Sequence, residues 1–327
     1  MRASSCIDGT VPTRRPPAGP GYPRFRSMAT SLPVFALRRL VAAVLLAVAV
    51  SALTFLTLHG LYPEAFGDTR PLLVECFHFL VRTFVHFDLG GQGEIAAEIG
   101  RGLGADFSLL IGAMAFGIGA GVWAGVTCAR YPGTWRARIL QLLSLLALCT
   151  PVYVIGMVAI LLFKPGIDAP LPFGILPYHG YVPFLDNPLK WLHSLLVPWI
   201  AAGLPLAAVC MRMTRATMSE IRDEDFIRTA AAKGLTPVAI SVRHVLPVAL
   251  PPVVSLAGAY TPLLIGNVIL IEKVFDVPGI YQVIPSALSL GDYIMIQGVV
   301  IVTAVFVVIV NGLVDIALAA IDPRVRV

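Results

Sequence analysis

The sequence predicts an all-α protein that crosses a membrane about six times. Of its 327 residues, 57% are hydrophobic and only 13% are charged, whereas a water-soluble domain carries roughly 25% charged residues. Several apolar runs exceed the roughly 18 residues that are needed to cross a bilayer. Because backbone N–H and C=O groups in lipid must bond within their own segment, each of these runs is expected to be a helix.

Residues 1–31 precede the first apolar run and are rich in Pro, Gly and Arg. A segment of this composition buries too little apolar surface to fold. We expect it to be a disordered cytoplasmic tail, unless the translated chain begins at Met28. It does not resemble a cleaved signal peptide, since the apolar run that follows is too long.

Residues 34–327 then form one transmembrane domain. Its six apolar runs have 23 to 28 residues each, which is enough to cross a bilayer with some tilt. They cover about 34–58, 104–128, 138–163, 191–213, 248–271 and 293–320. Pro and Gly recur inside them, and membrane helices tolerate both because small residues let neighbouring helices approach closely.

The distribution of positive charge predicts the orientation. With the N-terminus inside, 18 of the 24 Lys and Arg residues fall in inside segments and six fall in outside segments. Positive charge collects on the cytoplasmic side of membrane proteins. Both termini and the polar loop 214–247 are therefore expected in the cytoplasm. The sequence has no basic stripe with interleaved aromatic residues, so nucleic acid is not expected as a partner.

The loop 214–247 is polar but patterned for two short helices. Ser219 is expected to cap the first helix, with the acidic side chain of Asp225 in its first turn, near the positive end of the helix dipole. Gly234 is a stop signal for that helix. Thr236 then caps a second helix, in which Pro237 takes the first position.

One face of the first helix has small side chains. Ile227, Ala230, Ala231 and Gly234 follow the spacing i, i+3, i+4, i+7 and so share that face. A short helix with such a face suits a groove on another protein. The pattern alone is equally compatible with a solvated pair of surface helices.

The loop resembles the coupling loop of bacterial ABC importer permeases. The string DFIRTAAAKGL at 225–235 is similar to the dipeptide and oligopeptide branch of that family, and Ala230, Gly234, Leu246 and Pro247 match its pattern. Further matches occur in the family's order: FDLGG at 87–91, TPVYVIG at 150–156, EKVFDVPGI at 272–280 and IDPRVRV at 321–327.

The chain departs from the family pattern at four places. Arg228-Thr229 replaces the usual Glu-Ala, and His244 replaces an Ile. Outside the membrane, Tyr62-Pro63-Glu64 stands where a Pro-Gly-Asp element is usual, and Tyr281 occupies a position usually held by Gly.

The resemblance implies the fold and partners of a type I importer permease in a bacterial inner membrane. Two different permease subunits would form the pathway, most simply for di- or oligopeptides delivered by an external binding protein. The residues that would couple this chain to two ATP-binding cassette domains are Asp225, Ala230, Ala231, Gly234, Leu246 and Pro247. The chain has no GxxxxGK[ST] phosphate loop. We therefore expect ATP and Mg on partner chains, and no catalytic, cofactor or metal site here.

Two alternatives remain at this point: a permease of the same family for another solute such as nickel, or an ion-coupled transporter or channel without an ATPase. An ion-coupled transporter predicts charges at mid-membrane depth and inverted repeats. Charges are recognised only near the ends of the runs, and no clear repeat is found. Glu272 and Lys273, where the fifth run ends, are expected to be interfacial anchors.

Overall fold

The computed structural model describes residues 32–63, 71–86, 94–163, 181–222 and 224–321, and these residues form helices without any strand. The predicted all-α class is confirmed. The tail 1–31, the FDLGG motif and nearly all of the IDPRVRV ending lie outside the described residues.

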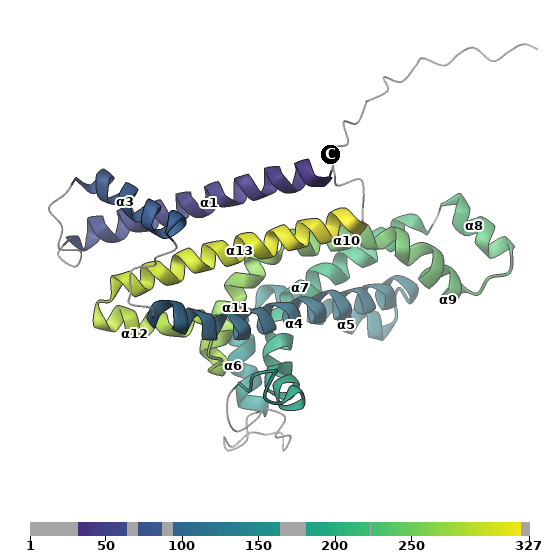
Figure 1. Ribbon diagram of the computed structural model, residues 1–327. Helices are drawn as coiled ribbons and strands as arrows, with labels where there is room; N and C mark the ends of the chain where they lie inside the picture. The colour runs from purple at the N-terminus through teal and green to yellow at the C-terminus, as the bar shows by residue number, and fades with distance from the viewer. Residues whose placement is uncertain (1–31, 64–70, 87–93, 164–180, 223, 322–327) are drawn as a thin grey trace, which may run out of the picture.

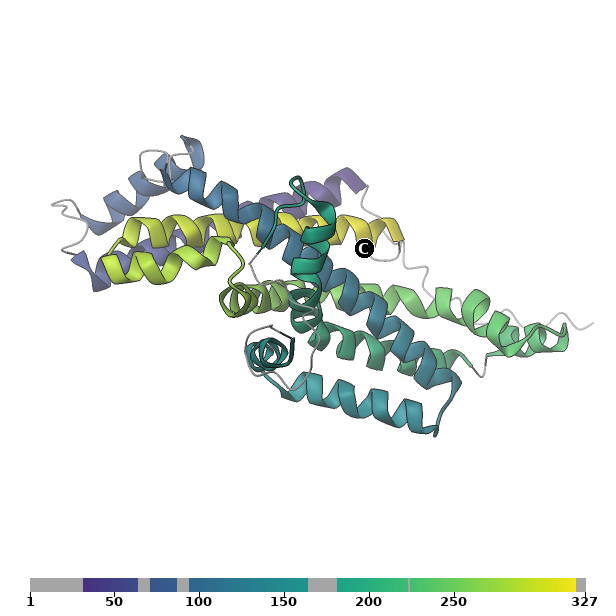
Figure 2. The same cartoon turned by 90° about the horizontal axis from the view of Figure 1, so that it is seen from below.

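Helices α1 Leu32–Leu61, α4 Glu94–Arg130 and α13 Tyr293–Ile321 lie lengthwise in the molecule (Figures 1 and 2). The start of α1 and the end of α13 point toward the end that carries α8 and α9, whereas α3 and α12 lie at the opposite end. The helices are α1 Leu32–Leu61, α3 Leu72–Val85, α4 Glu94–Arg130, α5 Trp135–Cys149, α6 Val152–Phe163, α7 Pro188–Ile221, α8 Asp225–Ala232, α9 Pro237–Ile240, α10 Leu246–Ala259, α11 Thr261–Phe275, α12 Val283–Leu290 and α13 Tyr293–Ile321.

Five stretches of the described helices are long and apolar enough to cross a membrane, and α5 with α6 makes a sixth if the pair counts as one span. The predicted number is confirmed. The five stretches are Val44–Leu61, Gly102–Arg130, Pro188–Ile221, Pro237–Ala259 and Tyr293–Val314.

The third apolar run, 138–163, is not one continuous helix. It breaks between α5 and α6, which meet at 114°. Thr150 at the break has extended backbone angles, φ −95° and ψ 126°. The cause is Pro151, whose ring disfavours helical angles in the residue before it and which lacks an N–H for the helix ladder.

The fifth run, 248–271, is also divided. Helix α10 ends at Ala259 and α11 begins at Thr261, with Pro262 in its first turn. A proline is tolerated there because the first N–H groups of a helix have no intrahelical partner. The sequence pattern did not separate these two helices.

The fourth run extends further than predicted. Helix α7 continues to Ile221, because Thr214 and Met218 remain buried beyond the apolar run. Ser219 consequently lies inside α7, and its hydroxyl donates to the carbonyl of Arg215 at 2.8 Å. The prediction that Ser219 caps the next helix is wrong.

Helix α3 lies between the first and second predicted apolar runs. It packs on α1, where His59 Nε2 and Glu75 Oε2 are 3.6 Å apart. Cys76 is buried within α3, and this burial raises the pKa of its thiol. A 14-residue helix is too short to cross a bilayer.

The core is centred on a tight seam between α4 and α7. A Cβ added to Gly121 would lie 2.6 Å from the Ala207 carbonyl oxygen, and one added to Gly125 would lie 2.6 Å from Thr214 Cβ. Trp199 Nε1 of α7 donates to the Ser108 carbonyl of α4 at 2.9 Å. Small residues thus bring the two helices close together, as in many membrane bundles.

Candidate functional site

The predicted coupling loop is a hairpin of two short helices, α8 and α9, at one end of the molecule (Figure 1). Helix α8 ends at Ala232, and Gly234, two residues later, has a φ of +79°. The Gly234 amide donates to Ala231 O at 2.9 Å and the Leu235 amide donates to Ala230 O at 3.4 Å. This bond pair defines a Schellman ending, which favours glycine at the left-handed position. The predicted stop at Gly234 is confirmed.

The second helix begins as the sequence predicts. Thr236 is its cap, and its hydroxyl accepts a hydrogen bond from the Ala239 amide at 3.3 Å. Pro237 follows at the start of α9. One turn of π-helix, Ser241–Val245, then leads into α10. The hairpin therefore continues without a loop into a membrane helix.

One side of the hairpin is attached to the rest of the chain by an apolar cluster. Ile227 and Ala230 of α8 are buried there with Met218 of α7. The cluster also holds Ile240, Val245 and Ala249, and Val126 and Ala129 of α4 pack against it. The hairpin is thus fixed to α4, α7 and α10 together.

The predicted small face of α8 is divided by this attachment. Ile227 and Ala230 contact the chain's own core, whereas Ala231, Gly234 and Asp225 are exposed. Ile227 and Ala230 are therefore unavailable to a partner in this structure. A helix wheel places Ile227, Ala230, Ala231 and Gly234 on one side but does not say which edge of that side the chain itself covers.

The exposed side of the hairpin carries large apolar residues. Phe226, Leu235 and Val238 are 44%, 39% and 49% exposed. Asp225 and Arg228 make an ion pair of 3.6 Å that is almost entirely in solvent, and such pairs contribute little to stability. These three apolar side chains are not covered by any other described part of the chain.

The last two predicted coupling residues lie at the base of the hairpin. Leu246 is half-buried against the apolar cluster, and Pro247 is exposed in the first turn of α10. They are separated from the tip of the hairpin by α9 and the π-turn. Leu246 and Pro247 therefore connect the hairpin to α10 and are not part of the tip of the hairpin.

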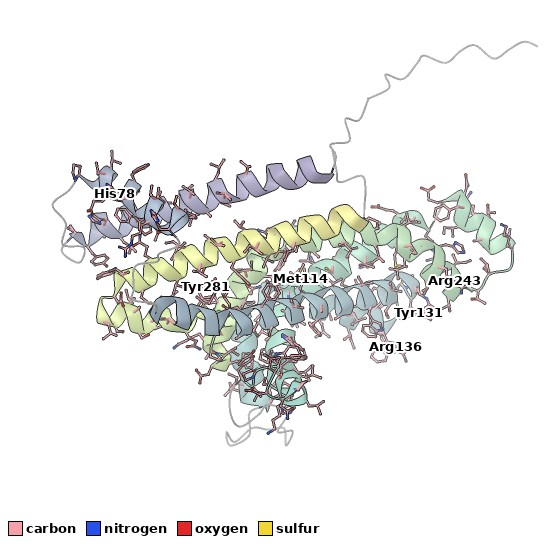
Figure 3. All side chains as sticks on the ribbon, viewed as in Figure 1. His78, Met114, Tyr131, Arg136, Arg243 and Tyr281 are labelled. Atoms are coloured by element: carbon pink, nitrogen blue, oxygen red, sulfur yellow. The ribbon has the colours of Figure 1, made fainter. Side chains whose placement is uncertain are left out.

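A hollow of about 610 Å³ lies between the hairpin and the end of α4. Arg130, Tyr131 and Arg222 line it together with Ala231 and Val238. In Figure 3, Tyr131 and Arg243 lie at this same end of the molecule. A side chain from a partner that packs on the exposed apolar residues would find space and two guanidinium groups here.

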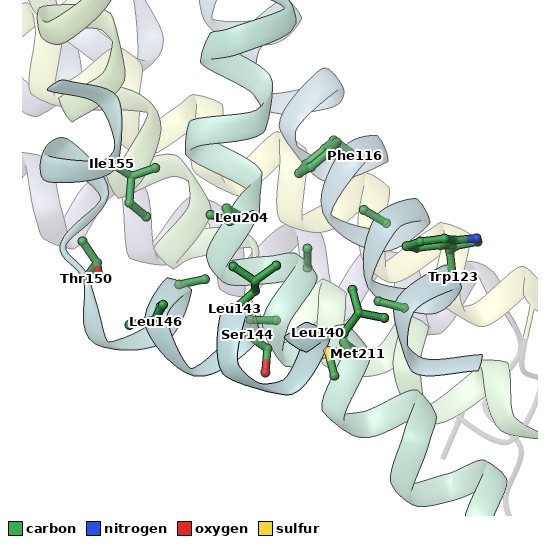
Figure 4. A pocket seen from close by; sticks show the side chains of 15 residues that line it. Phe116, Trp123, Leu140, Leu143, Ser144, Leu146, Thr150, Ile155, Leu204 and Met211 are labelled. Carbon is green, nitrogen blue, oxygen red and sulfur yellow. The ribbon is translucent and has the colours of Figure 1, made fainter. Parts of the chain in front are cut away.

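A second hollow, of about 330 Å³, is apolar (Figure 4). Phe116 and Trp123 of α4, Leu143 of α5 and Met211 of α7 line it, and the Ser144 hydroxyl beside them donates to Gln141 O at 2.8 Å. A ligand with charged groups finds no charged partner in this lining. The described residues also hold no group of three or more metal-ligating side chains.

A buried acidic pair, which the sequence pattern does not predict, lies far from the hairpin. Asp106 of α4 is 1% exposed and Glu272 of α11 is 0% exposed. The expectation that Glu272 is an interfacial anchor is therefore wrong, although its neighbour Lys273 is exposed as an anchor would be. A carboxylate within an apolar run is the signal that marks Asp106, because ionisable groups in membrane segments are costly.

Comparison with known proteins identifies the family. Residues 117–327, more than half of the chain, match the model of the family described as "Binding-protein-dependent transport system inner membrane component". A peptide transport system permease protein of Brucella abortus is 34% identical over 264 residues, covering 80% of this chain and 82% of the relative. A glutathione transport system permease protein of Pectobacterium atrosepticum is 32% identical over 264 residues, covering 80% and 81%.

A solved structure supports the same fold. A chain of the MetNI methionine ABC transporter, in inward-facing form, matches with a TM-score of 0.51 and 18% identity. The match covers 71% of this chain and all of that chain. The sequence match, the solved fold and the membrane-spanning helices agree, and the chain belongs to the family of inner-membrane components of binding-protein-dependent transport systems.

Proposed function

We propose that this chain is the pore-forming permease subunit of an ATP-driven importer for di- or oligopeptides. Membership of the binding-protein-dependent transport family carries this proposal. The peptide branch is favoured because relatives that cover about four-fifths of the chain are named peptide transport permeases, in Brucella abortus and in Sinorhizobium fredii. The glutathione permeases among the relatives are named for a substrate that is itself a peptide.

The α8–α9 hairpin is the element that couples the pathway to ATP hydrolysis. Its exposed apolar residues, Phe226, Leu235 and Val238, support docking into a groove of an ATPase domain. Gly234 provides the turn between the two helices. Ala230 and Leu246 act from the inner side, by holding the hairpin on the membrane helices.

The other subunits of the transporter are separate chains. A second permease completes the pathway, two ATP-binding cassette domains bind ATP and Mg, and an external binding protein delivers the peptide. The absence of a phosphate-loop motif from the sequence supports this division of labour. The charge asymmetry supports a cytoplasmic location for both termini and for the hairpin.

The test is purification through a tag on this chain in mild detergent, with a matched pair of variants. Val238→Asp alters the exposed side of the hairpin, and Leu290→Asp alters a residue that is 84% exposed at the end of α12. We expect the native chain and Leu290→Asp to bring two ATPase domains and a second permease. Val238→Asp is expected to lose the ATPases but keep the second permease, because only the docking face has gained a charge.

Peptide-stimulated ATP hydrolysis by the purified assembly, with the binding protein added, tests the substrate. Stimulation by nickel and not by peptides would replace the proposed substrate class. A native chain that purifies without any ATPase, even after crosslinking beside Gly234, would contradict the proposal and favour an ion-coupled transporter or channel.

A further inference from the structure

The outer turn, defined here as residues 276–282 between α11 and α12, is seated on one turn of α4. A Cβ added to Gly102 would lie 2.6 Å from the Ile280 amide nitrogen and 2.8 Å from the Gly279 carbonyl carbon. Asp106, four residues later on the same face of α4, accepts a hydrogen bond from the Ile280 amide at 3.1 Å. The turn therefore lies between Gly102 and Asp106.

Glu272, at the end of α11, holds the same turn from the other side. Its carboxyl Oε2 accepts from the Tyr281 amide at 3.2 Å, and its backbone oxygen accepts from the Gln282 side chain at 2.9 Å. The Val277 amide donates to the same backbone oxygen at 3.0 Å. Two carboxyl groups on two helices thus bind successive amides of one turn.

The two carboxyl groups meet over Gly279. A Cβ on this glycine would overlap both Asp106 Oδ1 and the carboxyl group of Glu272. Asp106 Oδ1 and Glu272 Oε1 are buried and have no hydrogen-bond donor in the part of the chain that the structure describes. Two ionised carboxylates that face each other this closely repel each other, and one proton between them removes the repulsion.

No described cation takes the place of that proton. The titratable group that faces the pair is the half-buried Tyr281 on the turn itself. Tyr260 lies beside Asn267, and Tyr293 stacks on Tyr62. Tyr153, Lys190, His193, Lys273, Asp276 and Asp292, which lie on neighbouring helices or beside the turn, are exposed.

We propose that Asp106 and Glu272 share one proton and form a latch that holds the outer turn against α4, so that the turn opens only when this proton leaves. In the open state both carboxyl groups are exposed to water, where the ordinary pKa of an Asp or Glu carboxyl group is about 4. Both are therefore ionised at neutral pH. The closed state therefore binds one more proton than the open state at neutral pH. Opening becomes about tenfold more favourable for each unit by which the pH rises.

The experiment measures opening of the outer turn by cysteine trapping in the assembled complex in membrane vesicles. Ile280→Cys is introduced in a background without native cysteines, because Ile280 is 1% exposed and reacts with a membrane-impermeant maleimide only after opening. The rate of maleimide labelling is measured between pH 6 and pH 9. It is divided by the labelling rate of a free thiol at the same pH, which removes the effect of thiol ionisation. The matched reference carries Asp106→Asn and Glu272→Gln, two substitutions that preserve shape and cannot share a titrating proton.

With the native pair, the corrected rate is expected to rise about tenfold per pH unit, whereas the double amide reference stays flat. Tyr281→Cys, half-buried on the same turn, serves as a second probe if Ile280→Cys does not assemble. A flat profile with the native pair, an equal slope in the amide reference, or protection of both at every pH overturns the latch. The readout does not depend on transport, so it stands apart from the proposed function.

Discussion

At the scale of single residues, Gly234 is required for its backbone angle rather than for its size. Its φ of +79° is in the left-handed region, but a Cβ at this position would meet nothing within 4 Å. A side chain there is strained by the turn and not by a collision inside this chain. The left-handed conformation costs a non-glycine residue roughly 1–2 kcal/mol, and asparagine tolerates it best.

Substitution of Gly234 therefore separates turn geometry from bulk. Gly234→Val is expected to abolish peptide uptake while the amount of chain in the membrane stays normal, because a β-branched residue at this angle breaks the Schellman ending. Gly234→Asn is expected to keep most of the uptake. Normal uptake by the valine variant, measured with labelled peptide in whole cells, would show that the turn is not needed for coupling.

At the scale of the elements, the α4–α7 seam holds helices whose packing depends on glycine. Gly119 and Gly121 lie two residues apart on α4 and differ only in what they face. A Cβ at Gly121 would approach the Ala207 carbonyl and Cys210 Cβ at 2.6 Å, whereas a Cβ at Gly119 meets nothing within 4 Å. The two positions are a matched pair for testing the seam.

Gly121→Leu is expected to destabilise the chain by roughly 1–3 kcal/mol, since the added atoms must push two backbones apart. Gly119→Leu should leave stability nearly unchanged, although it adds the same apolar volume to the same helix. Thermal unfolding in detergent, followed by the loss of the monodisperse peak in size-exclusion chromatography, compares the two. An equal fall in both midpoints would contradict the packing described for the seam.

At the scale of the whole molecule, the charge asymmetry and the structure agree on which segments share an end. The α8–α9 hairpin, the start of α1 and the end of α13 point one way, and α3 and α12 lie at the other end (Figure 1). Orientation relative to the cell follows from the positive charges alone. Val238 and Leu290, both exposed, report on the two ends.

Labelling of single cysteines in intact cells tests this orientation. Leu290→Cys is expected to react with a membrane-impermeant thiol reagent in spheroplasts. Val238→Cys should react only after the membrane is permeabilised, because the charge asymmetry predicts that the hairpin lies in the cytoplasm. The reverse pattern would invert the topology and remove the hairpin from reach of any cytoplasmic ATPase.

The sequence was sufficient for features that depend on neighbouring residues. The apolar runs, the stop at Gly234 and the cap at Thr236 all follow from local periodicity or local hydrogen bonding. It was insufficient where distant contacts decide. Helix α7 extends beyond Ser219, because the residues after its apolar run, Thr214 and Met218, are buried against α4. This packing overrides the local preference of Ser219 for a cap.

The acidic pair shows the same limit more clearly. The Ile280 amide and the Asp106 carboxyl are 174 positions apart in the chain. The periodicity of a single sequence does not predict such a distant contact. The position of Glu272 at the end of an apolar run is equally typical of an anchor at the membrane interface. The break at Pro151 lies between these cases, since the proline is visible in the sequence but the 114° angle that it allows is set by packing.

The glycine seam has a consequence for biogenesis. Helix α4 leaves the ribosome well before α7, because α5 and α6 lie between α4 and α7 in the chain. Until α7 is made, the narrow groove along Gly121 and Gly125 lacks the helix that packs into it, and lipid chains cannot match a packed helix atom for atom. The nascent chain therefore stays without its central pairing until the α7 residues that contact α4, from Trp199 to Thr214, have been synthesised, and the hairpin is made only after them.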